Sequence, residues 1–537
     1  MAGWRYAWSL SKEEVKNIVV LGTATPVDQE LQADYSHKRT PVPSASARDP
    51  LNWPAWRKTC CVFVMCAYTF IAEVNSAIVA PTMTNMVVYM VPRRTFAQLT
   101  NLIAINVLCI GVSNIFWVPV SNVTGRRPVL VIATLIMTLA TMCCALAYDN
   151  FPGLLAARAV QGIGMGPSFA IPATVITDVL FTHQIHHAMI LYASALSSGS
   201  IVGGLTGNYI ASSIGVKNMF WICTGLSASI FLMCCVLVPE TRFERAAGAS
   251  SPDVLSESKS EEVAPKDADC MHVEQTAPSF SGAPMTFAQS LRCDGFSNFD
   301  ASKLCSEFVG PLLMLRLPGV VVVMLQIAAL VGGIVTLSTV APQILAYPPY
   351  AWGANNGLIN IAGLLGSIAA VATSPIITVW QQRRLNVRRH TEGNLTLIEA
   401  EQRLPLAFPG LLLATTGLWT FGFSAQYPSP SGWVGLAFGY AMLCYGITEA
   451  AGVGFAYVGD AYQPVTGHCL TIIGVVRAVV AFAWTFFVGT WVEKSGDALP
   501  FGIFGMLMGV FSLLSIPLWV WGKRSRIATQ DFLCKAQ

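Results

Sequence analysis

The sequence predicts an all-α membrane protein in which twelve transmembrane helices form two six-helix halves. Composition is the first reason: hydrophobic residues make up 54% of the chain and charged residues only 11%, whereas a soluble domain carries about 25% charged residues. Apolar runs of about 20 residues also recur, each long enough to cross a hydrocarbon core of about 30 Å. A long polar stretch divides these runs into six and six.

The chain begins with residues 1–58, which are polar and rich in proline, serine and charge, and which we expect to form a disordered cytosolic tail. The first half follows at 59–239 and the second half at 317–522. The helices expected in the first half lie at 59–81, 98–120, 128–148, 152–177, 187–211 and 219–238. Those expected in the second half lie at 317–341, 354–379, 406–424, 432–458, 469–491 and 500–521.

Two further polar segments complete the chain. Residues 240–316 lack apolar periodicity and are expected to form a mostly disordered cytosolic linker. Within them, the stretch MTFAQSL has the pattern of a short amphipathic helix on the membrane surface. Residues 523–537 are expected to form a short cytosolic tail.

The placement of lysine and arginine predicts the orientation, because cytosolic loops carry an excess of both. If both termini are cytosolic, the loops on the opposite side hold only Arg93, Arg94, Lys217 and Lys494. The cytosolic side then holds Arg126, Arg127, Arg242, Arg245, Arg383, Arg384, Arg388, Arg389, Arg403, Lys523, Arg524 and Arg526. We therefore expect an integral, multi-pass protein of the plasma membrane with both termini in the cytosol.

The segment FTHQIHHAM places histidines at His183, His186 and His187, which is the spacing of membrane di-iron enzymes. A di-iron centre needs several more ligands, and the other histidines of the chain are single and scattered. The interpretation is an exposed cytosolic turn, with no metal, no cofactor and no enzymatic activity. The 15 cysteines lie mostly in apolar runs, where a thiol is a small apolar filler.

Other function classes are excluded by simple features of the chain. A net charge of +3 without a basic tract gives no sign of nucleic-acid binding. The chain lacks the G-x-x-x-x-G-K-[ST] pattern of an ATP-binding loop, so transport would take its energy from a gradient. The expected partners are a small-molecule substrate, protons and the lipid bilayer.

Several short motifs occur in a specific order. They are DPLNWPAWRK, GRRPVL, LLAARAVQGIGMG, PETRFER, PPYAWGANNGL, EAEQRL, GDAY and GKRSR. Together they resemble the major facilitator superfamily, in particular its fungal drug:proton antiporter-like branch. Two six-helix halves joined by a linker also suggest a transporter that rocks its halves about a site at the middle of the membrane, and we expect a monomer.

Two motifs depart from the pattern of this family. The loop after the second helix reads VPVSNVTGRR, so Asn122 occupies the place of an aspartate that would help latch the cytosolic face. In the fifth helix, Gly204 replaces the proline and Asn208 replaces the last glycine of the antiporter pattern G-P-x-x-G-G.

Four charged residues lie inside expected membrane helices, where a charge is costly and therefore points to function. Glu73 and Glu449 are candidates for proton carriers; the alternative is a structural pair, such as Glu449 with Arg477. Arg158 matches the arginine of the family's fourth-helix motif, which the resemblance links to proton coupling. Arg477 matches a family arginine for which a role in the cytosolic gate is an equal alternative.

Further residues are expected to form the gate, the helix contacts and the cavity. The candidate gate residues are Arg126, Arg127, Asp178 and Asp460. The candidate packing residues are Gly199, Gly203 and Gly207, which repeat every four residues. The polar residues available to a cavity are Asn75, Asn106, Gln161, Gln326, Asn356 and Asn360.

A mostly apolar cavity with few polar groups suits a lipophilic molecule. The resulting hypothesis is proton-coupled export of a drug, toxin or secondary metabolite by a fungal efflux pump. Proton-coupled uptake of an organic cation or chelate is one alternative. A membrane sensor that keeps the fold without transport is another.

Overall fold

The computed structural model describes residues 2–11, 14–15, 18, 23–24, 49–89, 95–242, 301–392, 398–462 and 465–536. Most of the expected tail, most of the expected linker with its MTFAQSL stretch, and Arg93 and Arg94 lie outside this part of the chain. The described residues are almost entirely helical, and their two short strands, β1 (Thr23–Ala24) and β2 (Ile398–Glu399), pair antiparallel.

Helices of the first half follow the expected order. They are α4 (Ala55–Ala77), α5 (Val79–Tyr89), α6 (Phe96–Thr124), α7 (Arg126–Leu146), α8 (Phe151–Met165), η3 (Gly166–Phe169), α9 (Ile171–Val179), α10 (Thr182–Ile214) and α11 (Val216–Leu237). Here α4 with α5 forms the first span, and α8, η3 and α9 together form the fourth. The first and fourth expected spans are therefore each a broken helix, whereas the second is the single helix α6.

The second half is built in the same way. Its elements are α14 (Pro318–Ala346), η6 (Gly353–Leu358), α15 (Ile359–Glu392), η7 (Ala400–Leu406), α16 (Ala407–Gln426), α17 (Trp433–Ala461), α18 (Thr466–Ser495), α19 (Ala498–Leu513) and α20 (Ser515–Ala536). Among the described residues, eleven spans are long and apolar enough to cross a membrane. With α10, a helix of 33 residues, they confirm the predicted twelve-helix fold class.

Short helices also occur where a tail and a linker are expected. They are α1 (Ala2–Ser9), η2 (Pro50–Asn52), α13 (Ala301–Leu313) and η5 (Met314–Arg316). Helix α1 packs against α20, where the rings of Trp8 and Trp521 lie 6.1 Å apart and Arg524 donates a hydrogen bond to the carbonyl oxygen of Leu10 at 3.2 Å. These contacts with the folded bundle explain why part of the polar N-terminal stretch is helical.

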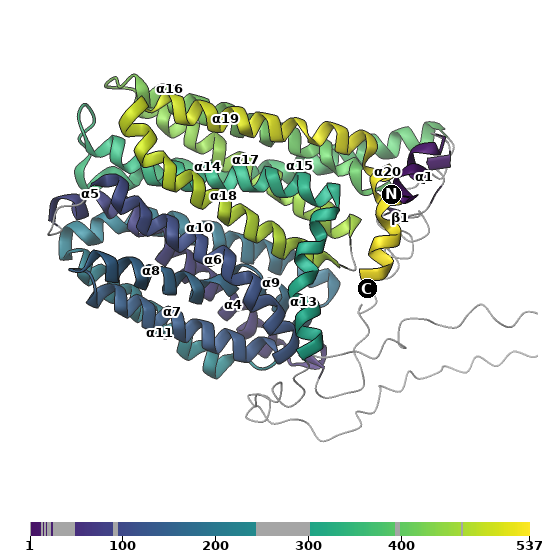
Figure 1. Cartoon of the computed structure of the whole chain (residues 1–537), viewed down its shortest axis with the longest axis horizontal. Coiled ribbons are helices and arrows are strands. Elements are labelled where there is room, and N and C mark those ends of the chain that lie inside the picture. The colour runs from purple at the N-terminus through teal and green to yellow at the C-terminus, as the bar shows by residue number, and fades with distance from the viewer. Residues whose placement is uncertain are drawn as a thin grey trace, which may run out of the picture.

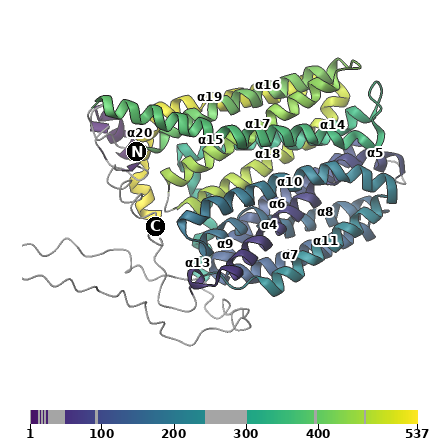
Figure 2. The ribbon, with the colours of Figure 1, turned by 180° about the vertical axis from the view of Figure 1, so that it is seen from behind.

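The two halves lie side by side along their long axes (Figures 1 and 2), the first half in purple to blue-green and the second in green to yellow. Helices α1 and α20 lie at one end of the bundle, called the terminal end below, and α5 lies at the opposite, distal end. Helix α6 packs along α18, and α10 packs against α15 and η6. These contacts form the seam between the halves.

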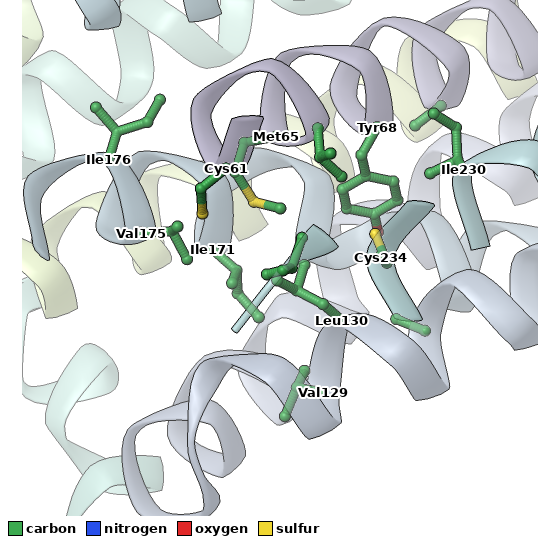
Figure 3. Packing of buried hydrophobic residues seen from close by; sticks show 14 of the residues in the cluster. Cys61, Met65, Tyr68, Val129, Leu130, Ile171, Val175, Ile176, Ile230 and Cys234 are labelled. Carbon is green, nitrogen blue, oxygen red and sulfur yellow. The ribbon is translucent and has the colours of Figure 1, made fainter. Parts of the chain in front are cut away.

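Each half has its own apolar core. In the first half, α4, α7, α9 and α11 converge on one cluster, and Figure 3 shows Tyr68 of α4 among Leu130, Ile171 and Cys234. The second half has a similar cluster between α14, α16, α17 and α19. Because each core lies inside one half, the halves are stabilised separately and meet only at the seam.

The seam is closed at the distal end by hydrogen bonds between the halves. The side-chain amide of Asn356 donates to the carbonyl oxygen of Pro81 at 3.3 Å, and that of Asn208 donates to Gly353 at 3.0 Å. The hydroxyl of Tyr209 bonds the amide oxygen of Asn355 at 2.6 Å. Asn208, which departs from the family pattern, thus contributes directly to this contact.

The three glycines of α10 lie against the backbone of the first span. A Cβ atom at Gly199 would lie 2.5 Å from the carbonyl oxygen of Phe70, and one at Gly203 would lie 2.7 Å from that of Val74. At Gly207 it would overlap the carbonyl oxygen of Ile78. These three glycines therefore allow α10 and the first span to approach more closely than any larger residue would permit.

We expect Gly203→Ala to destabilise the protein by about 1–3 kcal/mol, because the added methyl group must push α10 away from the backbone of α4. The measurement is the thermal unfolding midpoint of the purified protein in detergent. Gly225→Ala on α11 is the matched control, since a Cβ there meets nothing within 4 Å. Equal unfolding midpoints for the two variants would contradict the close approach.

Candidate functional site

The fourth span is broken by two prolines, and side chains from neighbouring helices satisfy the carbonyl groups that the break exposes. Pro167 and Pro172 have no N–H group, so the carbonyl oxygens four residues earlier lose their helical partners. The indole of Trp117 donates to Ile163 at 2.9 Å. The hydroxyl of Tyr192 lies 3.1 Å from the carbonyl oxygen of Ser168. These bonds keep the break stable inside the bundle.

Tyr192 also reaches the next carbonyl group of the break. Its hydroxyl lies 2.9 Å from the carbonyl oxygen of Phe169, the last residue of η3. Helix α10 is therefore bonded to the backbone of the broken span, and the ring of Phe169 is held at the seam.

The first span is also broken, between Ala77 and Val79, where Pro81 removes the helical partner of Ala77. The side chain of Arg158 lies at this break: its guanidinium donates to the carbonyl oxygens of the two residues before Ala77, Asn75 at 3.0 Å and Ser76 at 3.4 Å. Arg158 is completely buried. It therefore stabilises the break from within the first half.

The polar residues predicted for the cavity of the first half belong to the surroundings of Arg158. The amide oxygen of Gln161 accepts a hydrogen bond from the Arg158 guanidinium at 2.5 Å. The side chain of Asn106 donates to the backbone carbonyl oxygen of Arg158 at 3.0 Å. Asn75 donates to the hydroxyl of Ser227 at 3.0 Å. All of them are buried, so this network lies inside the first half rather than on an open surface.

Glu73 and Arg477 come together from opposite halves. The guanidinium carbon of Arg477, on α18, lies 4.0 Å from the centre of the Phe169 ring. Its charge also interacts with Glu73 on α4 and with the hydroxyl of Tyr192, without a direct ion pair to Glu73. Glu73, Phe169 and Arg477 are each only partly buried. The structure thus places an acid and a base across the seam, beside the break in the fourth span.

Phe169 and Tyr192 are the members of this site that sequence reasoning missed. The signal that could have found them is the spacing of Pro167 and Pro172, which marks a break inside an apolar run. Broken helices form the substrate and ion sites of many transporters, because their exposed backbone must line a cavity or be satisfied by side chains.

Glu449 lies elsewhere, inside the second half. It is 3% exposed, hydrogen-bonds Ser374 of α15, and packs against Gly410 of α16, where an added Cβ would lie 3.0 Å from its own Cβ. Its Oε2 atom has no hydrogen-bond partner. The suggested pair of Glu449 with Arg477 is not formed, because the charged neighbour of Arg477 is Glu73.

The remaining polar candidates hold helices together. The amide of Gln326 on α14 donates to the carbonyl oxygen of Phe511 at 3.0 Å and to the hydroxyl of Ser515 at 2.5 Å, where α19 gives way to α20. Asn360 accepts a hydrogen bond from Tyr440 at 3.1 Å. Asn356 belongs to the distal contact between the halves.

The candidate gate residues form ion pairs at the terminal end, each within one half. Arg126 pairs with Asp178 at 3.6 Å, and Asp460 pairs with Arg403 at 3.0 Å. The side chain of Arg127 donates to the carbonyl oxygen of Cys235 at 2.9 Å. The contacts of Arg126 and Arg127 tie the loop between the second and third spans to the fourth and sixth spans, and the Arg403–Asp460 pair joins η7 to α17 in the second half.

Glu240 completes this corner of the first half. Its carboxylate accepts hydrogen bonds from the backbone N–H groups of Arg126 at 2.9 Å and Arg127 at 3.2 Å, at the start of α7. A helix N-terminus attracts negative charge. Gly125 makes room, since it has a φ of 107° and a Cβ there would overlap the Glu240 carboxylate. The motifs GRRPVL and PETRFER therefore act as one structural unit.

In the second half, a buried ion cluster likewise joins two distant motifs. Arg526 is 1% exposed and binds Glu401 through Nε at 2.8 Å and Glu399 at 2.7 Å. Lys523 also binds Glu399, at 2.6 Å. The motifs EAEQRL and GKRSR, which are far apart in the sequence, thus meet at the terminal end.

No group of three or more potential metal ligands occurs among the residues searched, which are those that the structure describes. His183, His186 and His187 lie in the first turns of α10, and their side chains are outside the described part.

Comparisons with known proteins agree with this architecture. A family model described as Major Facilitator Superfamily matches residues 63–485. An uncharacterized MFS-type transporter of Schizosaccharomyces pombe is 24% identical over 90% of this chain and 87% of its own length. A probable efflux pump of Aspergillus flavus is 24% identical over 76% of this chain and 89% of its own.

Among solved structures, the xylose transporter XylE from E. coli has a similar fold. The TM-score is 0.56 at 15% sequence identity, covering 87% of this chain and 98% of that one. Because the family model spans most of the chain and the twelve-helix fold is the same, the chain belongs to the major facilitator superfamily.

Proposed function

We propose that this membrane transporter exports a lipophilic small molecule in exchange for protons, by alternating access across the plasma membrane with both termini in the cytosol. One observation carries the proposal: Glu73 of the first half and Arg477 of the second half lie within range of electrostatic interaction, and Arg477 rests on Phe169 of the broken fourth span. A carboxyl group at this place changes the attraction between the halves whenever it gains or loses a proton.

The coupling follows from electrostatics across the seam. Charged Glu73 attracts Arg477 and favours the arrangement in which the halves are close at this level. When Glu73 is neutral, the face of the Phe169 ring still holds the guanidinium, since an aromatic ring attracts a cation. The proton therefore biases an equilibrium between two arrangements of the halves, which is the requirement for coupled transport.

The arrangement of the seam supports access from the terminal end. The distal end is closed by Asn208, Tyr209 and Asn356. At the terminal end the gate pairs Arg126–Asp178 and Arg403–Asp460 each stay within one half, and α13, which is not one of the spans, packs against both halves. With the termini in the cytosol, a substrate would enter from the cytosolic side or from the inner leaflet. This direction of entry suits export.

The chemistry of the site supports an apolar substrate. The residue that the broken span presents at the seam is Phe169. The buried amides of the first half already bond other groups: Asn106 a backbone carbonyl, Gln161 the guanidinium of Arg158, and Asn75 the hydroxyl of Ser227. The relative in Aspergillus flavus is named a probable efflux pump. Proton-coupled uptake of an organic cation or chelate is the second candidate, favoured by the carboxylate of Glu73 at the seam.

We expect a yeast strain lacking its own efflux pumps to retain less of at least one lipophilic fluorescent dye when it expresses this chain. A protonophore should abolish the difference, because it removes the driving gradient. The measurement is dye retention across a panel at matched surface expression. Higher retention of a cationic dye would indicate uptake instead, and unchanged retention throughout the panel would favour the sensor alternative.

We expect Glu73→Gln to reduce gradient-driven export by about tenfold, the factor that a coupling free energy of about 1–3 kcal/mol implies. Exchange of substrate across membranes without a gradient should persist, because it requires no net proton movement. Glu449→Gln is the matched comparison and should keep gradient-driven export, since Glu449 lies within the second half. The reverse result would assign proton coupling to Glu449.

We expect Phe169→Leu to lower gradient-driven export by about fivefold, which corresponds to a cation–π interaction of about 1 kcal/mol. Phe169→Tyr keeps the ring and should retain export. The measurement is the initial rate of dye export as a function of pH. Equal rates for the leucine and tyrosine variants would show that apolar volume, not the ring, matters at this position.

A further inference from the structure

Helix α13, at the end of the segment between the halves, lies across the seam at the terminal end. Figure 1 shows it crossing the ends of helices from both halves. It packs against α6 of the first half and α18 of the second half.

The attachment of α13 to the first half is a chain of polar contacts that starts at Glu307. The amide nitrogen of Asn122 donates to the carboxylate of Glu307 at 2.7 Å. The amide oxygen of Asn122 accepts a hydrogen bond from Arg126 at 2.5 Å, and Arg126 pairs with Asp178 at 3.6 Å. The chain of contacts therefore connects α13 with α6, α7 and α9.

An amide is the group that this position needs. Asn122 donates to Glu307 and accepts from Arg126 at the same time, and a carboxamide offers these two functions on separate atoms. A carboxylate at position 122 would accept from Arg126 but would repel the carboxylate of Glu307. Asn122, which departs from the family pattern, is thus complementary in hydrogen bonding to Glu307 on α13.

Apolar contacts complete the attachment on both sides of the seam. The ring of Phe308 lies 6.2 Å from that of Phe116 on α6, measured between centroids. On the other side, a Cβ atom at Gly310 would lie 2.9 Å from the imidazole of His468 on α18. The absence of a side chain at Gly310 therefore allows α13 to rest on the second half.

We propose that α13 is a releasable brace across the terminal end of the seam, and that Glu307 is the positioning residue that attaches it to the first half. Alternating access changes the distance between α6 and α18 at this end. A helix bound to both must therefore either keep them at a fixed distance or detach from one of them. The segment between the halves therefore takes part in the movement of the halves. The brace does not depend on the substrate or on the direction of transport.

Hydrogen–deuterium exchange of the purified full-length protein in lipid nanodiscs tests the brace. We expect Asn122→Asp to speed exchange in peptides covering 301–313 by about tenfold, the factor that corresponds to one lost hydrogen bond. The double variant Asn122→Asp/Glu307→Gln restores the donor and acceptor pattern and should return to the wild-type rate. The exchange rate of peptides from α19, which is remote from α13, should not change, so these peptides serve as the internal control.

Phe308→Ala provides a second test that leaves the charges untouched. It removes the contact with Phe116 and should also speed exchange in α13. Unchanged exchange in both Asn122→Asp and Phe308→Ala would overturn the brace. Faster exchange in Phe308→Ala alone, or a double variant as fast as Asn122→Asp, would overturn the role of Glu307.

Discussion

The structure depends on one constraint: inside a bilayer, every exposed backbone carbonyl group needs a partner from the protein. Prolines open the first and fourth spans. Trp117 and Tyr192 bond the carbonyl groups freed in the fourth span, and Arg158 bonds two carbonyl groups just before the break in the first. Because these partners come from other helices, each break fixes the positions of its neighbours. The seam site follows from this arrangement, since the break in the fourth span presents Phe169 to Arg477.

The contacts between the two halves differ in kind from the contacts within each half. Within a half, apolar clusters and buried polar groups join the helices, as in the ion cluster around Arg526. Between the halves, the contacts are close helix packing, as at Gly111 against Ala478, and single hydrogen bonds at the distal end. Each half thus has its own apolar core and its own buried polar contacts, as two rocking rigid bodies require.

The sequence predicts the spans well because apolar length is a direct consequence of bilayer thickness. It does not predict the last turns of α15, which continue to Glu392, because a polar helical extension has no hydropathy signal. It singles out Glu73, Glu449 and Arg477 but not their grouping, because helix rotation decides which face meets the other half. Glu449 faces Gly410 within its own half, whereas Glu73 faces the seam.

The corner around Asn122 also fixes both ends of the segment between the halves. Arg242, at its start, donates a hydrogen bond to the carbonyl oxygen of Val123, and Glu307, near its end, accepts one from Asn122. The two attachment points are therefore consecutive residues of α6. Closing a chain between fixed points costs only about 0.6 kcal/mol more for each doubling of its length. Evolution can consequently lengthen, shorten or rewrite residues 243–300 while the transporting bundle keeps its geometry.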